Sequence, residues 1–124
     1  MDEKIKNFYD LNAWRKAHLL VLEVYKITEH FPKEELYGIV SQLCRAACSI
    51  TANIAEGFAR YHFKDKIRFY YQARGSAAEV QNFLILAKDL NFITIDSCRK
   101  LGLMSNEVAK LINGLIKSTE RQIH

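Results

Sequence analysis

Two glutamates, Glu56 and Glu79, are the residues of this 124-residue chain that could form a catalytic pair. In such a pair one carboxyl group acts as a general acid while the other acts as a base or nucleophile. Both are predicted to lie on facing sides of two helices near Arg68, where half-buried charges are tolerated only when they are paired. We therefore expect a structural polar cluster in which both glutamates flank Arg68 and Asn53 bonds to Ser76. An enzyme using the two carboxylates is the weaker alternative.

Metal and nucleotide chemistry lack their usual sequence signals. Di-metal sites in helical bundles use Glu-x-x-His pairs that place both ligands inward, and the sequence contains none. The histidines fall in separate segments, at His18, His30, His62 and His124. No Gly-x-Ser-x-Gly, P-loop or dinucleotide fingerprint is present. We therefore expect no metal, no cofactor, no small-molecule substrate and no enzymatic activity.

One cluster of basic residues is interleaved with aromatic residues, at the junction of two predicted helices. Cations beside aromatic rings can hold phosphates and stack on bases, so this cluster is a candidate nucleic-acid site. The alternative is a solvated helix start whose aromatic side chains plug the end of the bundle. The candidate residues are Arg60, His62, Lys64 and Lys66, and the aromatic residues are Phe58, Tyr61 and Phe63.

The elements that position these residues are predicted to be helices. Between Phe31 and Gly57 the apolar and small residues step alternately by four and three, which is the period of a long helix with one buried seam. The flanking sequence offers further segments with the same period, and Pro32 is the only proline. The pattern predicts an all-α fold, an antiparallel up-down four-helix bundle in one domain over residues 1–124. The expected helices cover 11–30, 34–57, 64–90 and 95–122.

The predicted first and third helices carry more apolar surface than one buried face needs. A monomer would expose this surplus as a patch, so it favours packing between subunits. The candidate oligomer-interface residues are Leu20, Ile27, Tyr71, Ala78 and Ile85.

Composition indicates which partners and which cellular compartment the protein suits. Eighteen Lys and Arg against fourteen Asp and Glu give a formal charge of +4, which permits contact with polyanions without requiring it. The three cysteines form no Cys-x-x-Cys motif and favour a reducing compartment. A polar N-terminus and the lack of a long apolar run predict a cytoplasmic protein with no membrane contact.

Several strings between Asp10 and Ile93 resemble the protein family first noticed within intervening sequences of bacterial 23S rRNA genes. They are Trp14 with Ala17, FPKEELYG at 31–38, SQLCRAACSI at 41–50, NIAEGFAR at 53–60, RFYYQARGSAAEV at 68–80 and ILAKDLNFI at 85–93. The resemblance implies an antiparallel four-helix bundle that assembles as a ring-like homopentamer. It also implies kinship with accessory proteins of diversity-generating retroelements, which bind a reverse transcriptase.

These observations predict a non-enzymatic homo-oligomeric scaffold or adaptor. Its basic surfaces are expected to contact RNA or an RNA-handling protein such as a reverse transcriptase. The alternative is a protein-binding structural module with no nucleic-acid role, whose positive charge is incidental.

Overall fold

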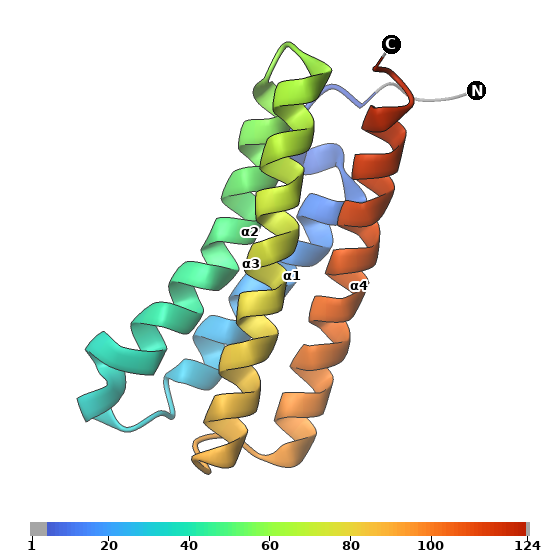
Figure 1. The fold of residues 1–124 in the computed structure, drawn as a ribbon. Helices are drawn as coiled ribbons and strands as arrows, with labels where there is room; N and C mark the ends of the chain where they lie inside the picture. The colour runs from blue at the N-terminus through green and yellow to red at the C-terminus, as the bar shows by residue number, and fades with distance from the viewer. Residues whose placement is uncertain (1–4, 124) are drawn as a thin grey trace.

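The computed structural model describes residues 5–123, and over this range the chain forms four α-helices and no strand. Consecutive helices pack against each other, and the last also packs against the first. The chain reverses direction at each connection (Figure 1). The predicted all-α class is therefore confirmed, while residues 1–4 and 124 of the predicted domain lie outside the described range. The helices are α1 (Asn12–Thr28), α2 (Ser41–Ala59), α3 (Phe63–Asp89) and α4 (Ile95–Glu120).

Helix α1 buries a slightly different face from the predicted one. Leu20, expected on an outer apolar face, has an exposed fraction of 0% in the core, whereas Trp14 and Val21 are only partly buried. The Trp14 ring instead stacks on His18, with 4.7 Å between ring centroids. The prediction that Leu20 belongs to an oligomer interface is therefore wrong, because its side chain is already enclosed by its own bundle.

The predicted helix 34–57 is interrupted near its start. A 3-10 turn covers Lys33–Glu35 and a π-helical turn covers Leu36–Val40, so the α-helix begins only at Ser41. Gly38 has φ −105° and ψ −115°, outside the helical region, and a Cβ there would lie 2.9 Å from Glu35 Oε1. We call Lys33–Val40 the kinked segment; it projects beyond the bundle at the lower left of Figure 1. Leu36, predicted to be buried, is 53% exposed as a result.

The other helix ends follow local signals. Helix α2 continues past Gly57 to Ala59, and residues 60–62 link it to α3. Asn91 ends α3 with a left-handed φ of 64°, and the Phe92 N–H donates to Ala87 O at 2.8 Å. Thr94 caps α4 by accepting from the Ser97 N–H at 3.0 Å. The expected bounds here, 90 and 95, lie within one residue of the observed ones, because each end depends on a few neighbouring residues.

Candidate nucleic-acid interface

The link between α2 and α3 forms one end of the bundle. Tyr61 is 88% exposed on this link, and His62 begins α3 with extended backbone angles and an exposed side chain. Its ring meets that of Tyr61 edge to face, with centroids 5.1 Å apart. The link is short and polar, so the rings of Tyr61 and His62 stay in solvent at the start of α3.

Lys66 has a structural role at this end. Its Nζ donates to Phe58 O at 2.7 Å and to Gly57 O at 3.5 Å. These carbonyls belong to the last turn of α2, where carbonyl groups lack the regular helical donors four residues on and cations are attracted. Partial burial lowers the pKa of Lys66. Its ammonium group is thus committed to capping α2, which leaves fewer donors for a phosphate.

Arg60 is exposed but already has partners. Its guanidinium contacts Glu56 at 3.1 Å, and its Cζ lies 4.6 Å from the centroid of the Phe69 ring. Although such an exposed ion pair contributes little to stability, a phosphate would still have to displace the Glu56 carboxylate from the guanidinium. Arg60 is therefore a weaker phosphate ligand than its position in the sequence indicates.

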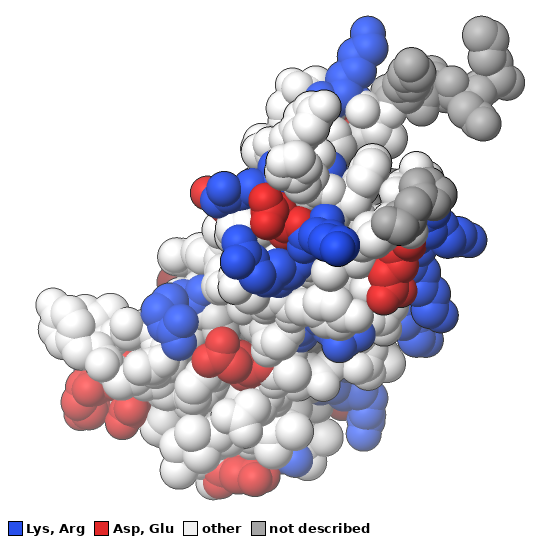
Figure 2. Space-filling model, turned by 45° about the horizontal axis from the view of Figure 1, so that its top comes forward, with Lys and Arg blue, Asp and Glu red and all other residues white. Residues whose placement is uncertain are grey.

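Lys64 and His62 lie next to the end of α4. A surface depression of about 460 Å³ is lined by residues of both regions, namely His62, Phe63, Lys64, Asp65, Gln122 and Ile123. Lys117 in the last turn of α4 and Arg121 directly after the helix are also exposed. Neither these two residues nor Lys64 forms an ion pair with any residue between 5 and 123. In Figure 2, Lys and Arg side chains gather over the upper part of the molecule and along its right edge.

Only the structure separates the free cations of α4 from the paired ones. Lys100 donates to Glu23 of α1 at 2.7 Å, and with Lys26 it lowers the pKa of Glu23. Arg99 lies 3.6 Å from Asp96. The basic outer face of α4 is visible in the sequence, but the Lys100–Glu23 contact spans 77 positions and has no local signal. We name Lys64, Lys117 and Arg121 the free basic cluster.

The predicted polar cluster has different partners from those expected. Arg68 pairs with Asp65 at 3.9 Å on its own helix, and Glu79 accepts from Arg45 at 3.4 Å. The predicted flanking of Arg68 by two glutamates is wrong because Arg60 and Arg45 lie nearer to Glu56 and Glu79, respectively.

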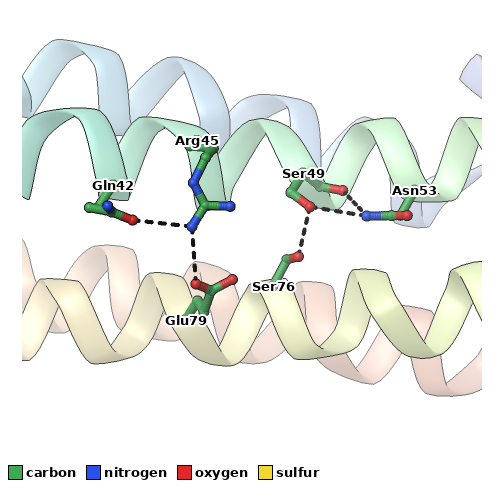
Figure 3. A network of polar contacts seen from close by, with 6 residues as sticks. All are labelled: Gln42, Arg45, Ser49, Asn53, Ser76 and Glu79. Carbon is green, nitrogen blue, oxygen red and sulfur yellow. Dashed lines mark hydrogen bonds and ion pairs between the residues drawn. The ribbon is translucent and has the colours of Figure 1, made fainter.

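Ser49 takes the place that the prediction gave to Asn53. The Ser76 hydroxyl donates to Ser49 Oγ at 2.9 Å, across the contact between α3 and α2. Asn53 Nδ2 donates to Ser49 Oγ at 3.0 Å and to Ser49 O at 2.8 Å, within its own helix (Figure 3). The helix-to-helix bond that involves Ser76 therefore exists, with a residue one turn earlier than Asn53.

Glu56 and Glu79 do not share a site. Arg45, the partner of Glu79, precedes Glu56 by about three helical turns, which separates the two carboxylates by roughly 16 Å along α2 at 1.5 Å per residue. That separation exceeds what a carboxyl pair acting on one bond requires. Both side chains are also exposed. The alternative of a paired-carboxylate enzyme is contradicted by this geometry.

The remaining chemistry-bearing side chains make ordinary packing contacts. Cys44 and Cys48 are free and face α1, where their sulfur atoms lie 3.7 Å from Thr28 Oγ1 and 3.6 Å from Tyr25 Oη. Burial raises the pKa of the Cys44 thiol. Within residues 5–123, no group of three or more His, Cys, Asp or Glu could hold a metal ion.

The other candidate interface residues lie outside the core. Tyr71, Ala78 and Ile85 are exposed on α3 at seven-residue intervals, and Ile27 is half-buried on α1. None of the helices formed by residues 5–123 combines the length and apolar character that crossing a membrane requires.

Comparison with known proteins identifies relatives by fold and by sequence. A similar solved structure is that of a protein of unknown function from the S23 ribosomal protein family of Bacteroides thetaiotaomicron VPI-5482. The TM-score is 0.76 at 24% identity, over 85% of this chain and 98% of that one, so the likeness concerns the fold. No curated protein sequence matches the chain. The family model described as 23S rRNA-intervening sequence protein matches residues 9–114. Because this match spans most of the sequence, the chain belongs to the 23S rRNA-intervening sequence protein family.

Proposed function

We propose that the protein is a non-enzymatic, homo-oligomeric scaffold that contacts RNA through the free basic cluster. The observation that carries this proposal is that Lys64, Lys117 and Arg121 are all exposed toward the end of the bundle where α3 begins and α4 ends, and that none of them pairs with a carboxylate between residues 5 and 123. Cations that are not already paired give up less when they bind phosphate, and they release counterions from the nucleic acid.

Exposed rings at the same end support RNA over a simple anion. Tyr61 and Phe63 are both exposed beside His62. Aromatic side chains can stack on unpaired bases, and this stacking contributes about 1–3 kcal/mol per base. The arrangement therefore suits single-stranded or looped RNA, whose bases are accessible, better than a continuous duplex.

Assembly into an oligomer would repeat the weak RNA site on every subunit. We propose that the antiparallel up-down bundle forms a ring-like homopentamer, which would present the free basic cluster once per subunit. Linked weak sites gain avidity because binding at one raises the effective concentration at the next. The partner is then an RNA, or an RNA-handling protein such as a reverse transcriptase together with its RNA.

A titration of labelled, looped RNA tests the proposal. Lys64→Ala/Lys117→Ala is compared with Lys26→Ala/Lys88→Ala, which removes the same charge from lysines that already pair with Glu23 and Asp89. The test variant should weaken binding and flatten the salt dependence by roughly 0.7 in log–log slope for each lysine that contacts phosphate. The control variant should bind like the unmodified protein.

Two outcomes would overturn the RNA proposal. Equal loss in both variants would mean that net charge, not the free basic cluster, drives binding. An intact oligomer that binds no RNA even at low salt would favour the alternative function, a protein-binding structural module. Isolation of tagged protein from cells would then be used to identify protein partners.

A further inference from the structure

The kinked segment presents an apolar tip to solvent. Tyr37 is 91% exposed, the highest value among the large apolar and aromatic residues of the described range, and Leu36 beside it is 53% exposed. The segment is nevertheless anchored, because Phe31 and Ile39 on either side of the tip are buried. A tip held in place by its flanks loses little conformational entropy when it binds.

A groove of about 240 Å³ lies between α3 and α4. Ile85 and Leu103 form exposed apolar walls, and Gly102 leaves the floor open, since a Cβ there would meet nothing within 4 Å. The groove is lined by Gln81, Leu84, Ile85, Cys98, Gly102 and Leu103, with Arg99 and Asn106 at the rim.

The tip and the groove lie at the same level of the bundle. The Ser49–Ser76 and Arg45–Glu79 contacts set the register of α2 against α3, so that the start of α2 is level with residues 84–88 of α3. The Gln81–Asn106 contact, with the chain running in opposite directions in α3 and α4, sets Ile85 level with Gly102.

The tip and the groove also lie on opposite sides. Helix α2, which carries the kinked segment, packs between α1 and α3, and α4 occupies the diagonal corner. In Figure 1 the kinked segment projects at the left, whereas α4 forms the right edge. The tip of one molecule can therefore reach the groove of a neighbour while its own groove stays open.

Charge favours the same pairing. Glu34 and Glu35 precede the tip, and neither forms an ion pair with any residue between 5 and 123. Arg99 at the rim of the groove is 68% exposed and holds Asp96 only at 3.6 Å. Docking of the tip would bring the unpaired acidic residues toward this arginine, and Lys33 is the only opposing charge on the kinked segment.

We infer that the tip, Leu36 and Tyr37, inserts into the groove between α3 and α4 of a second copy of this chain. Such a contact is heterologous, because it joins two different surfaces, and its repetition produces a ring when the rotation closes. Because the tip and the groove lie at similar heights, the contact adds no large rise along the bundle axis, and the rotation between successive copies sets whether the ring closes. This inference rests on the proposed homo-oligomer and names the surfaces that build it.

Two kinds of variant separate this interface from any other. Leu36→Ala/Tyr37→Ala removes the tip but keeps the groove, and Leu103→Asp blocks the groove but keeps the tip. Each variant alone should be a monomer by light scattering at a concentration where the unmodified protein is an oligomer. Mixed together, they should form a one-to-one heterodimer, because one tip and one groove remain intact.

Control variants test folding and specificity. Tyr61→Ala removes an equally exposed tyrosine at the other end of the bundle, and Ser118→Asp adds a charge to α4 away from the groove. Both should keep the oligomer. Gly102→Gln fills the groove without a charge and should also give monomers, while its helix propensity guards against unfolding. Circular dichroism melting should show every variant folded.

The outcomes distinguish the inference from the proposed function. If the unmodified protein is an oligomer and the tip and groove variants keep its mass, the inference is wrong while the scaffold proposal stands. If the variants are monomers but the mixture forms no heterodimer, the contact is not tip to groove. A monomeric unmodified protein would overturn the inference and the homo-oligomeric scaffold together.

Discussion

Replacement of Gly57 by alanine should destabilise the protein, although it occupies a helix, where alanine is normally preferred. A Cβ at this position would lie 2.7 Å from Tyr70 Cε1, 2.9 Å from Tyr70 Cδ1 and 3.1 Å from Lys66 O. Tyr70 is buried, so its ring cannot swing aside into solvent. Glycine at this position therefore lets α2 and α3 approach closely.

Two opposing effects set the magnitude. Overpacking of a buried site costs about 1–3 kcal/mol. Alanine in place of glycine in a helix gains about 1 kcal/mol through propensity. We expect a net loss of up to about 2 kcal/mol in the free energy of unfolding, with a corresponding fall in the urea midpoint.

A second background isolates the steric effect. In a Tyr70→Ala protein the ring is absent, so the Gly57→Ala change should become neutral or stabilise by up to about 1 kcal/mol. Gly75→Ala is the matched control, because a Cβ at that exposed helical position meets nothing within 4 Å. It should stabilise the unmodified protein by about 0.5–1 kcal/mol. All proteins are unfolded in urea at one subunit concentration, because assembly adds to apparent stability.

The sign of the effect is the decisive result. If Gly57→Ala were as stable as the unmodified protein, the close approach of α2 to Tyr70 would not be limiting. An equal loss with and without the Tyr70 ring would assign the cost to the backbone contact with Lys66 instead.

Three smaller predictions concern the polar contacts and the buried phenol. Ser49→Ala should lower the unfolding free energy by about 1 kcal/mol, because Ser76 loses its acceptor across the helix contact, and urea unfolding measures it. Thr94→Ala should cost about 1 kcal/mol by removing the cap on the Ser97 N–H, with loss of helical signal near the start of α4 by hydrogen exchange. Burial raises the pKa of Tyr70 from 10.0 to about 12, so its contribution to stability is complete below pH 10 and is lost as the pH rises toward 12. Between pH 9 and 11 the unmodified protein should lose about 1.4 kcal/mol more than Tyr70→Phe, and an equal loss would contradict the shift.

Local signals made much of the fold predictable. The bounds expected for the third and fourth helices, 64–90 and 95–122, lie within two residues of the observed ones. Asn91 and Thr94 explain this success, because a left-handed end and a side-chain cap depend on residues a few positions apart. The core of α2 from Leu43 to Gly57 also follows the predicted period.

The kink at Gly38 escaped prediction because the apolar period continues through it. Leu36 and Val40 fit a helical seam as well as Leu43 does, and a glycine in a helix does not by itself imply a break. The non-helical angles at Gly38 instead accompany tertiary packing, in which Phe31 contacts Phe92 at 5.5 Å between ring centroids and Ile39 is buried.

The candidate site residues likewise include some that local sequence predicts and some that depend on tertiary packing. The amino-acid sequence alone was enough to predict the helical class, the end of α3, the start of α4, the basic character of the bundle end and the resemblance to the family. Only the tertiary structure decided that Lys66 caps α2, that Leu20 is enclosed, and which cations lack partners. A helical period specifies a face to within about one residue, or 100°. Burial and ion pairing depend on which side chains of other helices meet that face, and those residues are distant in the sequence.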